Sequence, residues 1–272
     1  MTTIRVATYN LWASDIQFAE RLDAACAELT RVNPDVLALQ EVRHTDPGNT
    51  GAASSIGERT GLNHMLSAPG DPGETDAPAL LSKHPLSLVD PVSGRETAAP
   101  PCVVRAWTSV NGVRLAITNV HLDWRSIASR ERQIVAVIDW IAATGELDRH
   151  EVLLGDFNCT PESSVYRFLM GQQTIAGRET VPWHDLAQLQ AVRNGWEPGP
   201  TLDFENNPRW AEAPTLDVPA RVDWILIRDC FAKGLPYPKL ADAGLFGVTP
   251  PPSRTVVPSD HYGVFADLAF PE

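Results

Sequence analysis

The 272-residue sequence has few cysteines, a shortage of basic residues and no long apolar segment. Its four cysteines, Cys26, Cys102, Cys159 and Cys230, are widely spaced and match neither a zinc-binding pattern nor a disulfide framework. We therefore expect reduced thiols in a cytoplasmic protein. No apolar run reaches the roughly 18 residues of a membrane span, and no signal peptide is recognisable, so neither feature is expected.

Acidic residues outnumber basic ones, 34 to 22, which gives a formal net charge of −12. Proteins that hold nucleic acids by their phosphates usually carry a basic face. The balance therefore weighs against a long nucleic-acid groove, although a local basic cleft is compatible with it. It suits a phosphorylated small molecule or a lipid headgroup whose charge is offset by a bound metal. We expect the protein to be a monomer.

Several short apolar segments are followed by polar, metal-binding side chains. Such strand ends occur at residues 4–10, 35–41, 113–121 and 151–158, and residues 259–261 lead into a final strand at 262–268. Residues 221–227 form another apolar segment that carries Asp223. A charged side chain in such a segment is costly unless it is hydrogen-bonded or paired. Asp223 is therefore a candidate functional residue.

Helical spacing of apolar residues predicts helices at about 16–32 and 126–143, with Asp15 as an N-cap of the first. A short helix is expected after Thr160-Pro161, with Pro161 at its first position. Residues 103–110 and 113–120, joined by Asn111-Gly112, indicate a hairpin with a primed turn. The Pro/Gly-rich stretches 69–78, 195–219 and 234–258 are predicted to be loops. Strands connected both by helices and by hairpins favour an α/β sandwich of mixed sheets, formed by one domain over residues 1–272.

The motifs together suit the hydrolysis of a phosphoester. This reaction needs a hard divalent cation with oxygen ligands, a positioned water, and donors around the developing negative charge. Taken singly, Glu41 is also compatible with a solvated strand end, and His121 with a buried structural histidine. Asp156 and Asp260 are equally compatible with ordinary turns or caps. Their joint occurrence is what favours a metal-phosphate site.

The order of these motifs resembles the endonuclease/exonuclease/phosphatase superfamily. The resemblance rests on Tyr9-Asn10, Gln40-Glu41, His121-Leu122, Gly155-Asp156-Phe157-Asn158, Val222-Asp223-Trp224-Ile225 and Ser259-Asp260-His261, which follow one another in the family's order. It implies a four-layer αββα sandwich, in which two mixed β-sheets face each other, helices flank them and the site lies at one end.

The resemblance also implies roles for individual residues. Glu41 would be the principal ligand of Mg²⁺, or of Mn²⁺, with Asn10 and Asp260 beside it. Asp156 and Asn158 would orient the attacking water and hold the phosphate. His261 would be the catalytic imidazole, with Asp223 fixing its tautomer and raising its pKa.

The remaining candidates contact the substrate. His121 would contact a phosphate oxygen or the leaving group. It stands where the abasic-site repair nucleases carry Tyr, and where DNase-like and sphingomyelinase-like members carry His. The segment 202–208 resembles a sphingomyelinase-like loop and makes Asn206 and Asn207 candidate phosphate contacts. Arg105 is a candidate anion contact, or alternatively an outward-facing charge on a half-exposed strand.

Three functions are compatible with the sequence. The first is a Mg²⁺-dependent phosphoesterase that hydrolyses a phosphodiester or phosphomonoester of a small molecule or lipid headgroup. The second is a metal-dependent DNA or RNA nuclease of the same fold, which the acidic charge disfavours. The third is a non-catalytic binding module, which is disfavoured because every expected site position is filled. The general base, the number of metals and the bond cleaved are left open.

Overall fold

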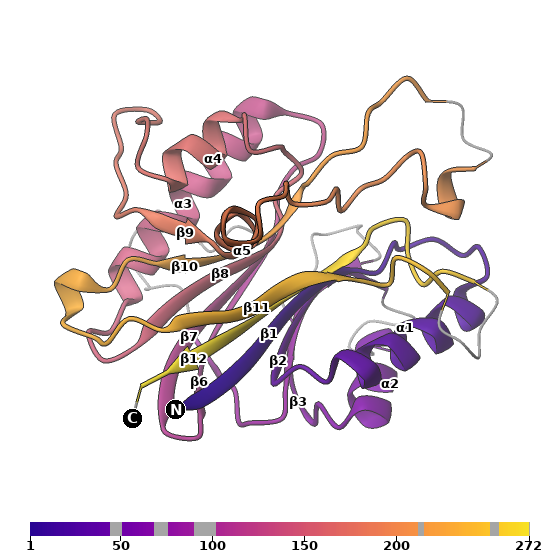
Figure 1. The fold of residues 1–272 in the computed structure, drawn as a ribbon, viewed down its shortest axis with the longest axis horizontal. Helices are drawn as coiled ribbons and strands as arrows, with labels where there is room; N and C mark the ends of the chain where they lie inside the picture. Colours follow the sequence, from indigo (N-terminus) through magenta and orange to yellow (C-terminus); the bar gives the residue numbers. More distant parts are fainter. Residues whose placement is uncertain (44–50, 68–75, 90–101, 212–214, 251–255, 272) are drawn as a thin grey trace.

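The computed structural model describes residues 1–43, 51–67, 76–89, 102–211, 215–250 and 256–271 (Figure 1). Its strands form two six-stranded sheets, with the orders β11-β12-β1-β2-β4-β3 and β5-β6-β7-β8-β10-β9. The strands are β1 Thr2–Asn10, β2 Val36–Arg43, β3 His64–Ser67, β4 Asp76–Ser82, β5 Ser87–Leu88, β6 Val103–Val110, β7 Val113–His121, β8 His150–Asp156, β9 Trp183–Asp185, β10 Asp223–Arg228, β11 Lys239–Phe246 and β12 Gly263–Phe270. The helices are α1 Phe18–Val32, α2 Gly51–Thr60, α3 Ile127–Thr144, α4 Ser164–Leu169 and α5 Leu186–Asn194, with 3-10 turns at Pro208–Trp210 and Phe231–Lys233.

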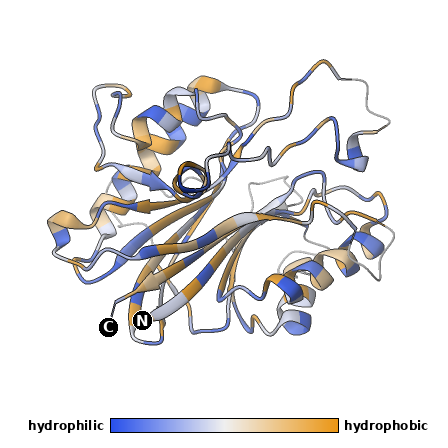
Figure 2. Ribbon diagram, viewed as in Figure 1, coloured by the Kyte–Doolittle hydropathy of each residue, from blue (hydrophilic) through white to orange (hydrophobic). Residues whose placement is uncertain are grey.

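The two sheets pack face to face around an apolar core. Ile4, Val6, Ile117 and Leu154 belong to this central layer and are fully buried. A second apolar layer lies between the first sheet and helices α1 and α2, and a third between the second sheet and helices α3 and α4. Hydrophobic residues accordingly run along the strands, and hydrophilic residues are frequent in the loops (Figure 2). The predicted four-layer sandwich is confirmed.

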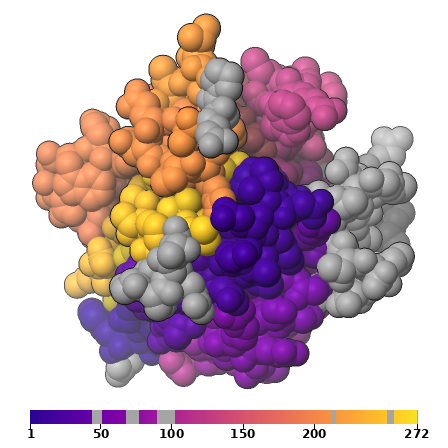
Figure 3. Space-filling view, turned by 90° about the vertical axis from the view of Figure 1, so that its right-hand side faces the viewer, coloured from indigo at the N-terminus to yellow at the C-terminus, as the bar shows by residue number. Residues whose placement is uncertain are grey.

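The strand directions bring the polar strand ends to one end of the sandwich. β1 is parallel to β2, and β7 is parallel to β8, so the last residues of each pair lie side by side. β10 and β12 run in the opposite direction, so their first residues reach the same end. Figure 3 looks onto this end, where the N-terminal segment (indigo), the C-terminal segment (yellow) and residues near 200–220 (orange) lie side by side.

Local predictions agree with the structure where a specific residue type sets the backbone. Asn111 and Gly112 both have positive φ, as a primed hairpin turn requires, and they join β6 to β7. α3 begins after Ser126, whose hydroxyl accepts the Ser129 N–H. The N-cap predicted at Asp15 is wrong. α1 instead begins after Gln17, which is left-handed, while Asp15 forms an ion pair with Arg43.

Several segments differ from the sequence-based expectation. α4 begins at Ser164, capped by Ser163, rather than directly after Pro161. The stretch 234–258, predicted as a loop, contains β11. A register shift between Leu240 and Asp242 interrupts its alternation, so the strand period is not visible in the sequence. α2 and α5 were not predicted, because short helices show few periods of apolar spacing. The still shorter α4 was expected only because of Pro161. Within the described chain, no helix is long and apolar enough to span a bilayer.

Candidate active site

A β-bulge in β2 sets the direction of Glu41. In a regular strand Glu41 would share the outward face of Leu39, which packs in the layer beneath α1 and α2. Instead, the pairing with β4 shifts register between Leu39 and Val42, and Glu41 adopts a left-handed φ of 51°. An extra residue in one strand re-aims the side chains around it. The bulge therefore turns Glu41 toward the end of β1.

Glu41 is held there by two hydrogen bonds. Its Oε1 accepts a hydrogen bond from Asn10 Nδ2 at 3.0 Å, and its Oε2 accepts one from the Ala13 N–H at 2.9 Å. Burial by itself would raise the pKa of Glu41, but the nearby His121 and these two hydrogen bonds outweigh it and lower the pKa. Glu41 is therefore an anion at neutral pH, and its side chain keeps 26% of its surface exposed.

Asp156 ends β8 and faces the same point. Its Oδ2 accepts a hydrogen bond from Asn10 Nδ2 at 3.0 Å, and its Oδ1 accepts the Asn158 N–H at 2.8 Å. Burial, followed by repulsion from Asp223, raises the pKa of Asp156 to about 6. Gly155 makes this strand end possible, because a Cβ there would lie 2.0 Å from the Val120 carbonyl oxygen. Asn158 has a φ of 50° and donates its amide to the Leu122 carbonyl at 2.8 Å.

His261 and Asp223 form a buried pair. His261 Nδ1 lies 2.9 Å from Asp223 Oδ2, and the other ring nitrogen, Nε2, lies 4.0 Å from Asp156 Oδ2. Burial alone would lower the pKa of His261, but attraction to Asp223, their hydrogen bond, and attraction to Asp156 and Asp260 raise it well above its ordinary value. The hydroxyl of Thr201 accepts the Asp223 N–H at 3.1 Å and steadies the start of β10.

The segment before β12 places Asp260 close to these groups. The Ser259 hydroxyl donates to the Asn10 carbonyl at 2.7 Å and accepts the His261 N–H at 3.2 Å, which ties the segment to the end of β1. Burial is the main cause that raises the pKa of Asp260 to about 6, and repulsion from Glu41 adds to it. Asp260 and Glu41 therefore act on each other as neighbouring negative charges.

His121 completes the cluster from the end of β7. Its Nε2 lies 3.8 Å from Asp156 Oδ2 and 3.9 Å from Glu41 Oε1. These separations are longer than hydrogen bonds, and the side chain is partly exposed. The structure therefore brings together the following sequence-predicted residues: Asn10, Glu41, His121, Asp156, Asn158, Asp223, Asp260 and His261.

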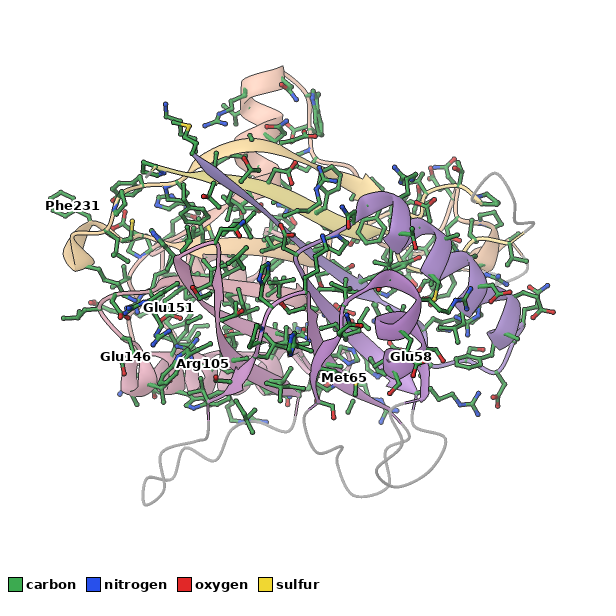
Figure 4. All side chains as sticks on the ribbon, turned by 90° about the horizontal axis from the view of Figure 1, so that it is seen from below. Glu58, Met65, Arg105, Glu146, Glu151 and Phe231 are labelled. Carbon is green, nitrogen blue, oxygen red and sulfur yellow. The ribbon has the colours of Figure 1, made fainter. Side chains whose placement is uncertain are left out.

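Three other predicted residues lie in different settings. Arg105 is fully buried in an ion pair with Glu151, 2.8 Å away, so its side chain is neither an accessible anion contact nor an outward-facing charge. Figure 4 shows Arg105 and Glu151 close together, away from the end that carries the cluster. Asn207 is buried and donates to the Ser259 carbonyl at 3.0 Å, so it supports the Asp260 segment. Asn206 is exposed and donates to Asp203 at 3.1 Å.

Two supporting residues were missed by the sequence reasoning. Asn119 donates to the carbonyls of Leu39 and Ala79, at 2.8 and 2.9 Å, on the two strands that flank the bulge. Arg21 is buried and donates to the carbonyls of Leu11, Trp12, Ser14, Ile16 and Pro258, which joins the loops around Asn10 and Asp260. Asn119 could have been recognised from the sequence, because a polar side chain in an apolar strand is costly to bury unless it is hydrogen-bonded. The same reasoning singled out Asp223. Arg21 lies on a polar helix face and gives none.

The donor set has the chemistry of a divalent cation site. Glu41 and Asp260 supply carboxylate oxygens, the ligand type that Mg²⁺ prefers, and the Asp156 carboxylate lies beside them. Asn10 directs Nδ2 at Glu41 and Asp156, and its Oδ1 accepts the Trp12 N–H at 2.9 Å, so its amide would have to turn to offer the metal an oxygen. The raised pKa values of Asp156 and Asp260 indicate negative charge that the protein alone does not balance. Asp156, Asp223 and His261 also offer donor atoms within 4.8 Å of one another. In that trio, however, His261 Nδ1 is already engaged by Asp223.

Comparison with known proteins identifies the family of the chain. The model of the Endonuclease/Exonuclease/phosphatase family matches residues 7–261. The chain belongs to this family. Members of the Endonuclease/Exonuclease/phosphatase family are hydrolases of phosphoester bonds. A search of curated proteins found no match.

Solved structures of the family share the fold at low sequence identity. D. rerio TDP2, complexed with single-strand DNA product, is 18% identical with a TM-score of 0.71, covering 98% of this chain and 99% of that one. The human Nocturnin catalytic domain with bound sulfate is 18% identical with a TM-score of 0.68, covering 99% and 95%. A family member from Bacteroides vulgatus is 20% identical with a TM-score of 0.68, covering 100% of both chains.

Proposed function

We propose that this chain is a Mg²⁺-dependent phosphoesterase that hydrolyses a phosphodiester or phosphomonoester of a small molecule or lipid headgroup. We further propose that residues 1–272 act as one cytoplasmic catalytic domain. The observation that carries the proposal is the placement of the His261–Asp223 pair 4.0 Å from Asp156, whose other neighbours include Asn10 and His121. An imidazole, carboxylates and amides thus converge on one point.

The metal would be held by Asn10, Glu41 and Asp260. Glu41 is the ligand best prepared for this role, because it is ionised, partly exposed and fixed by two hydrogen bonds. Mg²⁺ suits a set made only of oxygen donors, and Mn²⁺ is the alternative. When bound, the cation supplies positive charge to the phosphoryl oxygens.

His261 is proposed to act as a hydrogen-bond donor to the phosphate. Its Nδ1–H is directed at Asp223, so Nε2 is the nitrogen that faces the centre of the cluster. Attraction to Asp223 and their hydrogen bond raise the pKa of His261 above its ordinary value, which favours the ring with a proton on Nε2. It therefore stabilises negative charge on the phosphate rather than removing a proton from water.

Asp156 is the better candidate for the general base. Its pKa of about 6 lies close to neutral pH. A base with such a pKa is mostly deprotonated and still has a useful affinity for a proton. Asn158 fixes one oxygen of this carboxylate, and the other faces Asn10 and the two histidines. Asp156 would orient the attacking water with Asn158, while His121 contacts a phosphate oxygen or the leaving group.

The experiment is a hydrolysis assay with Mg²⁺ or Mn²⁺ on bis-p-nitrophenyl phosphate, p-nitrophenyl phosphate, sphingomyelin, plasmid DNA and RNA. Activity on the small esters or the lipid, lost in His261→Ala, is expected. A matched control is His184→Ala, because His184 also faces an aspartate, Asp229 at 3.4 Å, but lies on β9 and is more exposed. Activity on polynucleotides alone would keep the site and overturn the proposed substrate class. Activity on none of them would overturn the proposal.

A further inference from the structure

A buried polar layer lies between the two sheets, next to the candidate active site. Its side chains are Thr8 on β1, Gln40 on β2 and Asn119 on β7, and all three are fully buried. Two positions earlier on each strand, the residue on the same face belongs to the apolar central core. Two positions later on β1 and β7 stand Asn10 and His121 of the cluster. The layer therefore separates the apolar core from the active-site cluster.

One edge of the Asn119 amide contacts the backbone beside the β2 bulge. Leu39 and Ala79 are the last regular pair of the β2–β4 ladder before the bulge. Asn119 Nδ2 donates to the carbonyl oxygens of both, at 2.8 and 2.9 Å. Opposite the bulge stands Pro78, which has no N–H with which to continue the ladder. Asn119 therefore joins β2 and β4 at the point where their own pairing stops.

The other edge of the amide contacts the bulge itself. Asn119 Oδ1 accepts a hydrogen bond from Gln40 Nε2 at 2.7 Å, and Gln40 Nε2 also donates to the Thr8 hydroxyl at 3.0 Å. Gln40 is the bulge residue that directly precedes Glu41. Because the oxygen and the nitrogen of the Asn119 amide are both engaged, its orientation is fixed. Asn119 thus connects the second sheet to the bulge that carries Glu41.

We propose that Asn119 is a positioning residue, which sets the direction of the Glu41 carboxylate by holding the bulge. Asn119 precedes His121 by two positions on β7, and a Cβ on Gly155 of β8 would lie 3.0 Å from its Oδ1. The bulge of the first sheet is thereby held in place relative to the strand ends of the second. The proposal rests on the proposed function in one respect, because it takes Glu41 to be a metal ligand.

Hydrogen exchange of the Ala13 amide, followed by NMR, tests the proposal without metal or substrate. The Ala13 N–H donates to Glu41 Oε2 at 2.9 Å, so its protection depends on the direction of that carboxylate. Asn119→Ala should accelerate this exchange about tenfold relative to the other amides, the scale of one hydrogen bond to a charged group. The control is Ser82→Ala, which should not. Ser82 is also fully buried, and it donates to the Asp35 carbonyl at 3.1 Å, away from the bulge.

Calorimetric titration with Mg²⁺ connects this geometry to the metal. Asn119→Ala should raise the dissociation constant of Mg²⁺ about tenfold, the low end of the range for residues that support metal ligands. Ser82→Ala should leave it unchanged, although both variants lose a buried hydrogen-bonding side chain. A wild type that binds no Mg²⁺ would overturn the metal role of Glu41. The Ala13 exchange would then still decide whether Asn119 sets the direction of that carboxylate.

Gln40→Met is a second variant, for the case that Asn119→Ala does not fold. It keeps the length of the side chain but removes the hydrogen bond to Asn119, and should accelerate Ala13 exchange about threefold, the scale of one neutral hydrogen bond. The proposal is overturned if Ala13 exchanges at the wild-type rate in folded Asn119→Ala or, failing that protein, in Gln40→Met. It is also overturned if Ser82→Ala accelerates Ala13 exchange equally, or if Asn119→Ala binds Mg²⁺ as tightly as a wild type that binds it.

Discussion

β8 buries a carboxylate near each of its ends, Glu151 and Asp156. Glu151 accepts hydrogen bonds from Arg105 at 2.8 and 3.1 Å, and the Lys233 ammonium lies 3.4 Å away. Asp156 receives bonds only from amides, while Asp223 lies near enough to raise its pKa. One strand therefore carries, near its start, a carboxylate paired directly with an arginine and, at its end, a carboxylate whose nearest basic groups are two histidines 3.8 and 4.0 Å away.

The two carboxylates differ in what their charge does. Glu151 is occupied by an ion pair within the fold, whereas Asp156 is available to a ligand. A buried ion pair recovers its desolvation cost through the partner, so Glu151 and Arg105 depend on each other. In the cluster around Asp156 the nearby imidazole of His261 is already engaged by Asp223, and burial raises the pKa values of Asp156 and Asp260. Strongly perturbed acids gathered at one end of a sheet are typical of functional sites.

The largest effect is expected for Glu41→Gln, which removes the charge of the proposed principal metal ligand. We expect hydrolysis to fall on the order of 10³-fold, the upper range for losing one electrostatic contact to the transition state. The fold should be retained, because the substitution relieves repulsion with Asp260. Thermal stabilisation by Mg²⁺, which we expect in the wild type, should disappear.

The control is Glu58→Gln, at an exposed position of α2. It should keep both the activity and the response to Mg²⁺. A Glu41→Gln protein that is still stabilised by Mg²⁺ to the wild-type extent would place the metal elsewhere in the cluster.

The next effect concerns stability. Arg105→Met leaves Glu151 buried with only Lys233 nearby, and should lower the free energy of unfolding by about 3–5 kcal/mol, as breaking a buried pair usually does. Removing both partners, in Arg105→Met with Glu151→Leu, should recover most of that loss. Denaturant titration measures both, and the activity per folded molecule should not change. A loss of activity greater than the loss of folded protein would give Arg105 a role in the site.

The fold was predictable where a specific residue type sets the backbone. Asn111-Gly112 indicated the hairpin turn, and apolar spacing indicated α3. β11 was missed because its register shift hides the strand period, and α5 because a helix of this length shows too few periods. Both elements line a cavity of about 310 Å³ whose wall also includes Asp223, so that cavity was not predictable from sequence patterns.

The site was predictable as a set of residues but not as a geometry. The strand-end motifs identified Glu41, Asp156 and His261 from their chemistry and their order. The direction of the Glu41 side chain depends on a bulge, whereas the sequence around it has the pattern of a regular strand. For Arg105 the sequence indicated an accessible charge where the structure has a buried ion pair. Its partner Glu151 lies on β8, beyond β7, so a local pattern shows the charge without the ion pair that occupies it.

β8 carries a third titratable group, His150, next to Glu151. We expect it to have a smaller effect, on the pH dependence of stability. Its ring packs at a tilt of 59° against Phe270 with 4.9 Å between centroids, and its Nδ1 has no partner among the described residues. Burial, with a contribution from Lys233, lowers the pKa of His150 from 6.5 to about 4. His150 is therefore neutral in the folded protein at pH 5, whereas it is protonated in the unfolded chain.

Between pH 6.5 and 4 the unfolded state therefore binds more protons than the folded state. The stability that depends on a neutral His150 is complete above pH 6.5 and is lost as the pH falls. Between pH 7 and pH 5 the loss should be about 1–2 kcal/mol, allowing for solvent screening. The measurement is denaturant unfolding of the wild type and His150→Phe at both pH values. Asp156 and Asp260 titrate in the same range, so the relevant quantity is the difference between the two proteins. His150→Phe should lose less stability on acidification than the wild type, and parallel losses would show that His150 takes up its proton without unfolding.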